Sequence, residues 1–289
     1  MKKWIKIAGR LVDFSAPKIM GIVNATPDSF YRQSRVNESD EVKRRLEQMI
    51  SAGADIIDVG GYSTRPGASE VGIQEEIDRV TPVIEQIKEI SSVVIISIDT
   101  FRSKVAEAAV SAGAQMINDV SGGTLDSTMF KTVALLDVPY VLMHMRGSPQ
   151  NMMKLTEYGD ICKDVIMDLQ KKISELKSWG IKDIIIDPGF GFAKTSEQSL
   201  NLLSHLDIFL MLELPILAGL SRKSMIWKTL NTSPEEALNG SIVLQTKALL
   251  KGGNILRVHD VSEAIELRHL LCSTFQEETK KPYNNFYHN

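Results

Sequence analysis

The stretch Val93-Val94-Ile95-Ile96-Ser97-Ile98-Asp99-Thr100 is an apolar run that ends on a carboxylate. Such a run predicts a strand that is buried on both faces of a parallel sheet. A helical pattern follows from Arg102 to Ala112, and Thr100 is placed to cap that helix. Because a buried parallel strand brings its last residues to the edge of the sheet where chemistry is usually done, we predict that Asp99 lies at the centre of an active site.

The same alternation of apolar and helical runs repeats along the chain. Eight apolar runs predict strands at residues 18–23, 55–59, 93–98, 115–120, 139–143, 183–186, 215–218 and 255–258. Amphipathic runs between them predict helices, among them 39–51, 73–90, 102–112, 160–179 and 234–250. Eight strands that alternate with helices predict an α/β fold, the (β/α)8 TIM barrel. An open doubly wound sheet is the alternative, weakened because no Gly-x-Gly-x-x-Gly turn follows the first strand.

The length of 289 residues suits one barrel domain, which typically needs about 250 residues. Residues 4–7 and 10–13 alternate in polarity around Ala8-Gly9, which indicates a β-hairpin. We therefore expect residues 1–17 to form a hairpin that caps the closed end of the barrel, residues 18–275 to form the barrel, and residues 276–289 to be a polar C-terminal tail.

Composition limits the partners of this protein. A formal net charge of −3 gives no support to a nucleic-acid or anionic-membrane partner, and no apolar run is long enough to span a bilayer. The two cysteines, Cys162 and Cys272, lack metal-ligand spacing and suggest reduced thiols. Residues 1–6 lack the features of a signal peptide. We expect a cytoplasmic protein that acts on small molecules.

Nearly every predicted strand delivers a polar side chain to the same rim. These residues are Asn24, Asp58, Asp99, Asn118, Asp119, His144, Asp187, Lys223, Arg257 and His259. A single Asn or Asp after a strand is often only a turn former, and we interpret Asp58 and Asp119 in that way. His144 and His205 are given no catalytic role. Helix or turn capping does not easily explain why so many polar residues occur at the same position, the end of a strand. Their joint occurrence indicates a barrel enzyme with its site on the C-terminal face.

Eight segments in order resemble the motifs of the dihydropteroate synthase family. They are Met20–Phe30, Gly60–Gly67, Ser97–Thr100, Ile117–Val120, Leu142–Met145, Asp187–Phe192, Ser221–Ser224 and Arg257–Asp260. The resemblance covers the chain from about Lys18 to Val261. It implies a (β/α)8 barrel, a homodimer and Mg2+ as cofactor. It also implies the folate-pathway condensation of 6-hydroxymethyl-7,8-dihydropterin pyrophosphate with p-aminobenzoate to 7,8-dihydropteroate and pyrophosphate.

The pterin substrate presents a flat donor and acceptor edge to the protein. A carboxylate at Asp187 can accept two N–H groups side by side, and Asn118 offers both a donor and an acceptor. Lys223 can donate to the ring, and Met143 is expected to wall the pterin slot. We assign catalytic roles to Asp99, Lys223 and Asp187, with Asp99 also in the pterin site.

The leaving pyrophosphate needs its negative charge neutralised as that charge develops. Arg257 and His259 lie two residues apart on one strand and are expected to point to the same side. By the resemblance, Asn24 holds Mg2+ and contacts phosphate oxygens, Thr64 contacts the pyrophosphate, and Arg65 acts from the second loop. Mg2+ keeps several waters, so a single amide oxygen is a sufficient protein ligand.

The p-aminobenzoate pocket is expected to include two aromatic rings and the ends of the first two loops. The residues are Thr26, Pro27, Phe30, Pro66, Phe192 and Ser224, with Ser224 at a helix N-terminus where an anion is favoured. Two departures from the family pattern fall in these loops. Tyr62 stands where members often carry Glu, and residues 31–34 read Tyr-Arg-Gln-Ser where members often carry Ser-Asp-Gly-Gly.

Three functions are compatible with a pterin-binding barrel. We favour the synthase, acting by a dissociative route in which pyrophosphate leaves first and Asp99 supports the resulting cation. A pterin-dependent methyltransferase barrel would need no pyrophosphate site, so Arg257 and His259 argue against it. A non-catalytic pterin-binding subunit would not need Asn24, Asp99 and Lys223 together.

Overall fold

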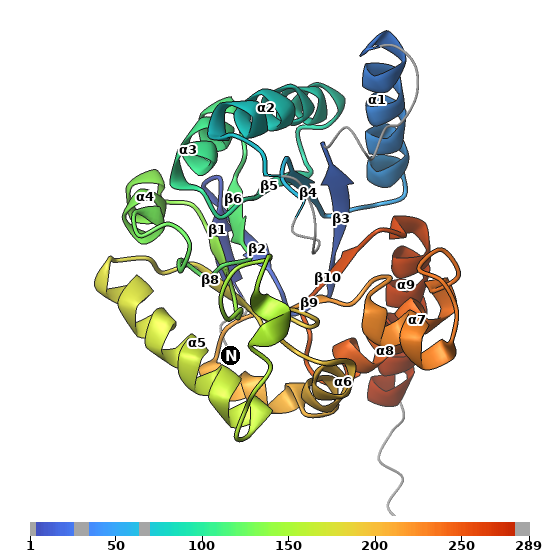
Figure 1. Cartoon of the computed structure of the whole chain (residues 1–289). Coiled ribbons are helices and arrows are strands. Elements are labelled where there is room, and N and C mark those ends of the chain that lie inside the picture. Colours follow the sequence, from blue (N-terminus) through green and yellow to red (C-terminus); the bar gives the residue numbers. More distant parts are fainter. Residues whose placement is uncertain (1–3, 26–34, 64–69, 281–289) are drawn as a thin grey trace, which may run out of the picture.

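A computed structural model describes residues 4–25, 35–63 and 70–280. Eight parallel strands surround one axis, with helices on the outside (Figure 1). Neighbouring strands follow the order β8-β7-β6-β5-β4-β3-β10-β9. Their bounds are β3 (Lys18–Asn24), β4 (Ile56–Gly60), β5 (Ile95–Asp99), β6 (Met116–Asp119), β7 (Tyr140–Met143), β8 (Ile184–Asp187), β9 (Leu217–Gly219) and β10 (Ile255–Val258).

The barrel closes between β8 and β9. A parallel bridge joins Ile186 to Ile216, and the Ile186 amide donates to the Pro215 carbonyl at 2.9 Å. A closed sheet has no exposed edge strand, and this contact rules out the open doubly wound sheet. The predicted (β/α)8 barrel is therefore confirmed.

The helices lie where the amphipathic runs predicted, with shifts at their ends. Their bounds are α1 (Arg35–Ser51), α2 (Ile73–Ile90), α3 (Ser103–Ala112), α4 (Met129–Leu136), α5 (Ile161–Ser178), α6 (Ser196–Ser204), α7 (Ser224–Leu230), α8 (Leu238–Leu250) and α9 (Val261–Lys280). Two short 3₁₀ segments are η2 (Met152–Lys154) and η3 (Leu206–Leu212). The domain boundary expected at residue 275 stays a prediction, and α9 continues past it to Lys280.

The start of α3 also differs from the prediction. Thr100 does not cap this helix: its hydroxyl accepts from the Arg102 amide at 3.2 Å and donates to Glu76 at 2.7 Å. The helix begins at Ser103, whose amide donates to the Asp126 carboxylate at 2.7 Å. The cap is supplied by a neighbouring loop, which a local sequence pattern does not reveal.

The interior of the barrel is built in layers. The lowest layer is apolar and contains Met20, Ile56, Met116, Val141, Ile185, Leu217 and Ile255. Ile5, Ile7 and Phe14 of the N-terminal segment pack against it. Because side chains alternate along a strand, the residues two positions further on form the next inward layer. That layer includes Asp58, Asn118, Met143, Asp187, Gly219 and Arg257, so the barrel changes from apolar to polar within two residues.

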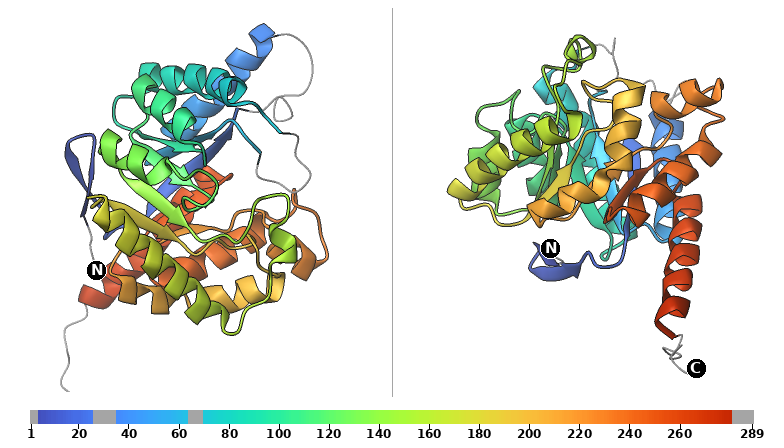
Figure 2. Two further views of the ribbon diagram at one scale, coloured as in Figure 1. Left: turned by 60° about the vertical axis from the view of Figure 1, so that its left-hand side comes forward. Right: turned by 90° about the horizontal axis from the view of Figure 1, so that it is seen from below.

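The N-terminal hairpin consists of β1 (Trp4–Ile7) and β2 (Arg10–Asp13), which pair antiparallel. Figure 2 shows it at one end of the barrel. Its apolar face covers the lowest layer and excludes water from that end. The polar layer faces the opposite, C-terminal end of the strands. Within the described ranges, the structure contains no helix long and apolar enough to cross a membrane.

Candidate active site

The centre of the polar layer is an arginine held by two carboxylates. Arg257 donates from Nε to Asp58 Oδ2 and from Nη2 to Asp99 Oδ2, both at 2.6 Å. Asn118 donates from Nδ2 to the same Asp58 oxygen at 2.9 Å. The register of the sheet brings the ends of these strands together, since Gly60 pairs with Asp99 and Asp99 pairs with Asn118. The structure thus brings Asp99, Asn118 and Arg257 together as predicted.

Asp58 was wrongly interpreted as a turn former. Its side chain is fully buried inside the barrel and links Arg257 to Asn118. Its Oδ1 atom has no hydrogen-bond partner among the described residues. A buried unpaired carboxylate oxygen costs free energy unless a ligand completes it, so Asp58 is part of the site. Side chains alternate between the two faces of a strand, so Asp58 lies on the same face as Ile56. This alternation is the sequence signal that could have placed Asp58 in the site.

Asp99 sits at the end of β5 with its side chain 12% exposed. The pKa of Asp99 is raised to about 7, because burial and the nearby Asp58 charge raise it by more than the Arg257 guanidinium lowers it. Burial lowers the pKa of Arg257, but the two carboxylates outweigh this effect and raise the pKa above its usual value. The paired ionised forms are the ones that the two short hydrogen bonds stabilise.

Asp187 and Lys223 form a second centre across the barrel mouth. The missing side chain of Gly219 leaves room between them, and a Cβ there would lie 3.7 Å from Lys223 Nζ and 3.9 Å from Asp187 Oδ2. Burial lowers the pKa of Lys223 to about 8, and Asp187 holds it up. Burial raises the pKa of Asp187, and Lys223 opposes that change. This pair offers a planar ligand both an acceptor and a donor.

Lys223 occupies the N-cap position of α7. Its Nζ donates to the Phe190 carbonyl and lies 4.9 Å from the centre of the Phe192 ring. Phe192 is half-buried and packs against a small apolar cluster around Met143, Met145 and Met152. Ser224 is the first residue of α7 and is half-buried. A flat apolar wall therefore stands beside the Asp187–Lys223 pair.

His259 lies just beyond β10 and is neutral. Its Nδ1 is 3.0 Å from the Ser221 hydroxyl, and burial together with Arg257 lowers the pKa of His259 to about 4. The loop that carries Ser221 is fixed by Arg222, which binds Asp260 through two donors. The effect of Arg257 on this pKa shows that the two residues lie near each other, and the expectation that they point to the same side stays a prediction.

Asn24 ends β3 beside Gly60. A Cβ on Gly60 would lie 3.9 Å from Asn24 Oδ1 and 3.7 Å from Asp99 Oδ2, so the glycine keeps open a space that both oxygens border. An amide oxygen next to a carboxylate suits Mg2+, which prefers oxygen ligands and retains waters. The residues present therefore fit the expected ion.

The remaining predicted residues either lie elsewhere or cannot be placed. Asp119 is structural, as interpreted, because it accepts from the amides of Ser121 and Gly123 and from the Tyr140 hydroxyl. His205 bonds to the Asn201 carbonyl at the end of α6 and borders a surface cavity of about 610 Å³ outside the barrel. Six predicted residues lie outside the described residues: Thr26, Pro27, Phe30, Thr64, Arg65 and Pro66.

Tyr62, where the sequence departs from the family pattern, is buried beside the site. Its ring meets Phe101 edge to face at 5.2 Å, and the Arg102 guanidinium lies 5.1 Å from its centre. Its hydroxyl accepts from Gln150 at 3.2 Å. The tyrosine therefore ties the end of β4 to the loops after β5 and β7 through packing and one hydrogen bond.

The fold and this arrangement of charges define a class, the pterin-binding barrels. The family model described as pterin binding enzyme matches residues 20–259. The chain is 45% identical to a dihydropteroate synthase of Clostridium beijerinckii over 85% of this chain and 89% of that protein. The chain belongs to the dihydropteroate synthase family.

Solved structures agree with this assignment. A dihydropteroate synthase of Yersinia pestis, crystallised with a sulfonamide drug complex, superposes with a TM-score of 0.88 at 38% identity and covers 94% of this chain and 99% of that chain. The enzyme of Xanthomonas albilineans in complex with 7,8-dihydropteroate gives a TM-score of 0.84 at 35% identity, covering 96% and 100%.

Proposed function

We propose that this protein is a dihydropteroate synthase, which joins 6-hydroxymethyl-7,8-dihydropterin pyrophosphate to p-aminobenzoate and releases pyrophosphate. The observation that carries the proposal is the facing pair Asp187 and Lys223 beside the Asp58–Arg257–Asp99 bridge at one barrel mouth. A family relative binds 7,8-dihydropteroate, the product of this reaction. Family membership and the site chemistry thus support the same activity.

Each side chain of the site has a proposed task toward the pterin. Asp187 accepts from the donor edge of the ring, and Lys223 donates to an acceptor on the same ring. Asn118 is fixed by Asp58 and presents its amide oxygen to the ligand. Met143 forms part of the wall of the slot. A neutral ring that develops positive charge would lie close to Asp99.

The diphosphate end is assigned to the other side of the mouth. Arg257 uses Nε and Nη2 on the two carboxylates, which leaves Nη1 as the group that can meet a phosphate oxygen. The neutral imidazole of His259 can donate one hydrogen bond to the leaving group. Asn24 would hold Mg2+, which when bound supplies positive charge to the diphosphate. Thr64 and Arg65 remain proposed contacts.

We further propose the dissociative order of events. Pyrophosphate departs while Asp99 stabilises the positive charge of the pterin methylene, and the aniline nitrogen then attacks that carbon. The aniline is unprotonated at neutral pH and needs no strong base. Phe192 and Ser224 are proposed for the aniline side with Thr26, Pro27, Phe30 and Pro66. A steep dependence of the rate on aniline basicity would contradict this order.

Pyrophosphate release by the purified protein tests the activity. We expect sustained release over many turnovers only when the pterin diphosphate, p-aminobenzoate and Mg2+ are all present, in equal amount to the dihydropteroate formed. Sustained release without p-aminobenzoate would indicate a hydrolase, and absence of release would refute the synthase.

A homodimer in the cytoplasm completes the proposal. Exposed apolar side chains on neighbouring helices α7 and α8 support a protein partner there, since Leu230, Val243 and Leu250 are 56%, 65% and 58% exposed. Light scattering should give twice the chain mass for wild type and the single mass for Val243→Lys. Both cysteines are free thiols, in keeping with a reducing compartment.

A further inference from the structure

Lys194 is a buried lysine outside the substrate-contacting set. Its side chain is 2% exposed, and it follows the segment Asp187–Phe192. Its Nζ lies 2.8 Å from His144 Nδ1, 2.9 Å from the Gly189 carbonyl and 3.0 Å from the Phe192 carbonyl. A fourth acceptor, the His144 carbonyl, lies at 3.3 Å. Burial lowers the pKa of Lys194 well below its usual value, and Asp187 opposes that change. Only the ammonium form has three donors for this shell of acceptors, so the geometry favours charged Lys194.

Two of the groups that Lys194 binds, the carbonyls of Gly189 and Phe192, belong to the segment that carries Asp187. Gly189 donates its amide to Asp187 Oδ1 at 2.7 Å, and its carbonyl accepts from Lys194. Gly189 has a φ of +73°, and a Cβ there would lie 2.1 Å from the His144 carbonyl oxygen. The two backbones are therefore in close contact, and the lysine draws three carbonyl oxygens toward one point.

We propose that Lys194 is a positioning residue for pterin recognition. Its ammonium fixes Asp187–Phe192 in the conformation that presents the Asp187 carboxylate to the pterin edge, and it places a positive charge behind that carboxylate. Lys223 supplies the charge in front. The inference rests on the proposed function, because it concerns the same pterin site.

Electrostatics supports this role. Burial raises the pKa of Asp187, while Lys223, Lys194 and Arg257 lower it. The charged and titratable groups around Lys194 are Asp187, Lys223, His144, Asp168, Lys172 and Arg146. Burial and the neighbouring lysines lower the pKa of His144 to about 2, so His144 is a neutral acceptor.

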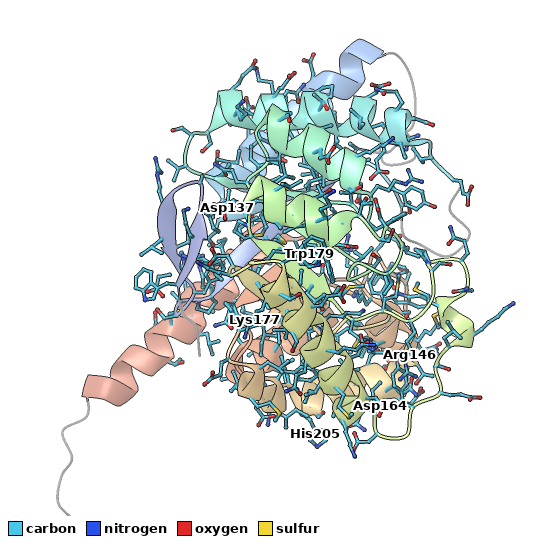
Figure 3. All side chains as sticks on the ribbon, turned by 90° about the vertical axis from the view of Figure 1, so that its left-hand side faces the viewer. Asp137, Arg146, Asp164, Lys177, Trp179 and His205 are labelled. Carbon is cyan, nitrogen blue, oxygen red and sulfur yellow. The ribbon has the colours of Figure 1, made fainter. Side chains whose placement is uncertain are left out.

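The outer members of this group are already paired with each other. Lys172 meets Asp168 at 3.1 Å, and Arg146 meets Asp164 at 3.5 Å on the α5 side of the molecule, where Figure 3 labels Arg146 and Asp164. Lys194 is thus, after Lys223, the second lysine whose positive charge lowers the pKa of Asp187. Its removal should raise the pKa of Asp187 and weaken binding most strongly at low pH.

Lys194→Met tests the proposal, because methionine has a similar length and no charge. Calorimetry with 6-hydroxymethylpterin at pH 6 and pH 8 measures the binding constant. We expect the dissociation constant to rise by at least about tenfold at pH 6 and by less at pH 8, as for loss of a charged hydrogen-bond partner. KM for p-aminobenzoate should rise less than the pterin dissociation constant, because among the described contacts Lys194 reaches that pocket only through the Phe192 carbonyl.

Lys172→Met is the matched control, a buried lysine that binds none of the Asp187–Phe192 carbonyls among the described contacts. It should leave the pH dependence of pterin binding unchanged. Equal weakening at both pH values, or equal losses for both substrates, would overturn the role of Lys194. Failure of the wild type itself to bind pterin would instead refute the proposed function.

A second measurement covers the case in which Lys194→Met does not fold. In wild-type protein labelled with [15N]lysine, the Nζ resonance of Lys194 should exchange slowly and shift when pterin binds. A Lys194 ammonium that exchanges rapidly, or that is indifferent to pterin, would contradict the proposal.

Discussion

Substitution of Arg257 by methionine should destabilise the fold strongly. The change removes both hydrogen bonds to Asp58 and Asp99, whose side chains are 0% and 12% exposed. Removal of one partner from a buried ion pair typically costs about 3–5 kcal/mol, because an uncompensated charge stays buried. Asp58 keeps only the hydrogen bond from Asn118. We expect the free energy of unfolding to fall by about 3–5 kcal/mol at neutral pH.

Urea unfolding followed by tryptophan fluorescence measures this loss. The control is Arg268→Met, which removes the partner of Asp55 at 2.5 Å on the other end of the barrel. Asp55 is 23% exposed and retains Lys18 at 3.6 Å and the Ile19 amide at 2.9 Å. That loss should therefore be about 1 kcal/mol, as for a partly solvated pair.

A double variant separates the lost charge pairing from lost packing. Arg257→Met combined with Asp58→Asn removes one of the two stranded charges, and it should recover at least about 1 kcal/mol relative to Arg257→Met alone. The reasoning is refuted if Arg257→Met lowers the free energy of unfolding by no more than Arg268→Met does. It is also refuted if the double variant loses the sum of the two single-variant losses.

Three further predictions concern the same structure. Lys223→Met should reduce pterin affinity by at least about tenfold, whereas Lys228→Met, on the same helix, should not. The pterin affinity of the wild type should fall as the pH rises through about 8, where Lys223 loses its proton. His144 stays neutral in the folded protein, whereas in the unfolded chain it takes up a proton below about pH 6.5. The free energy of unfolding should therefore fall by about 1.4 kcal/mol per pH unit on acidification below that pH. His144→Asn should reduce this slope in denaturation series. Asn24→Ala should raise the Mg2+ concentration for half-maximal rate, measured by titration, without weakening binding of the pterin alcohol.

The barrel could be predicted because its signal is local and repeated. Each strand is a mostly apolar run, and several end on a polar residue such as Asp99 or Asp187. The prediction for Asp58 was wrong because the role of this residue depends on which face of its strand lies inside the barrel. The sequence pattern around one polar residue does not show that face. Asp58 meets Arg257 across β3, which lies between β4 and β10 in the sheet.

Two other features depend on contacts that no local pattern carries. Lys194 follows a glycine-rich loop and looks like a solvated residue, but the turn at Ala193, with a φ of +49°, directs the chain so that its ammonium becomes buried among carbonyls from two segments. The cap of α3 comes from Asp126, in the loop after β6. Such pairings form only when the strands have closed into the barrel.

Formation of 7,8-dihydropteroate by wild type and by Asp187→Asn is the most direct test of the site assignment. Both proteins are supplied with pterin diphosphate, p-aminobenzoate and Mg2+, and product is quantified by chromatography; Asp183→Asn, four residues earlier and outside the barrel mouth, is the control. We predict steady product from wild type and from the control, and a loss of kcat/KM of at least about a hundredfold for Asp187→Asn. Wild-type rates in Asp187→Asn would contradict the account.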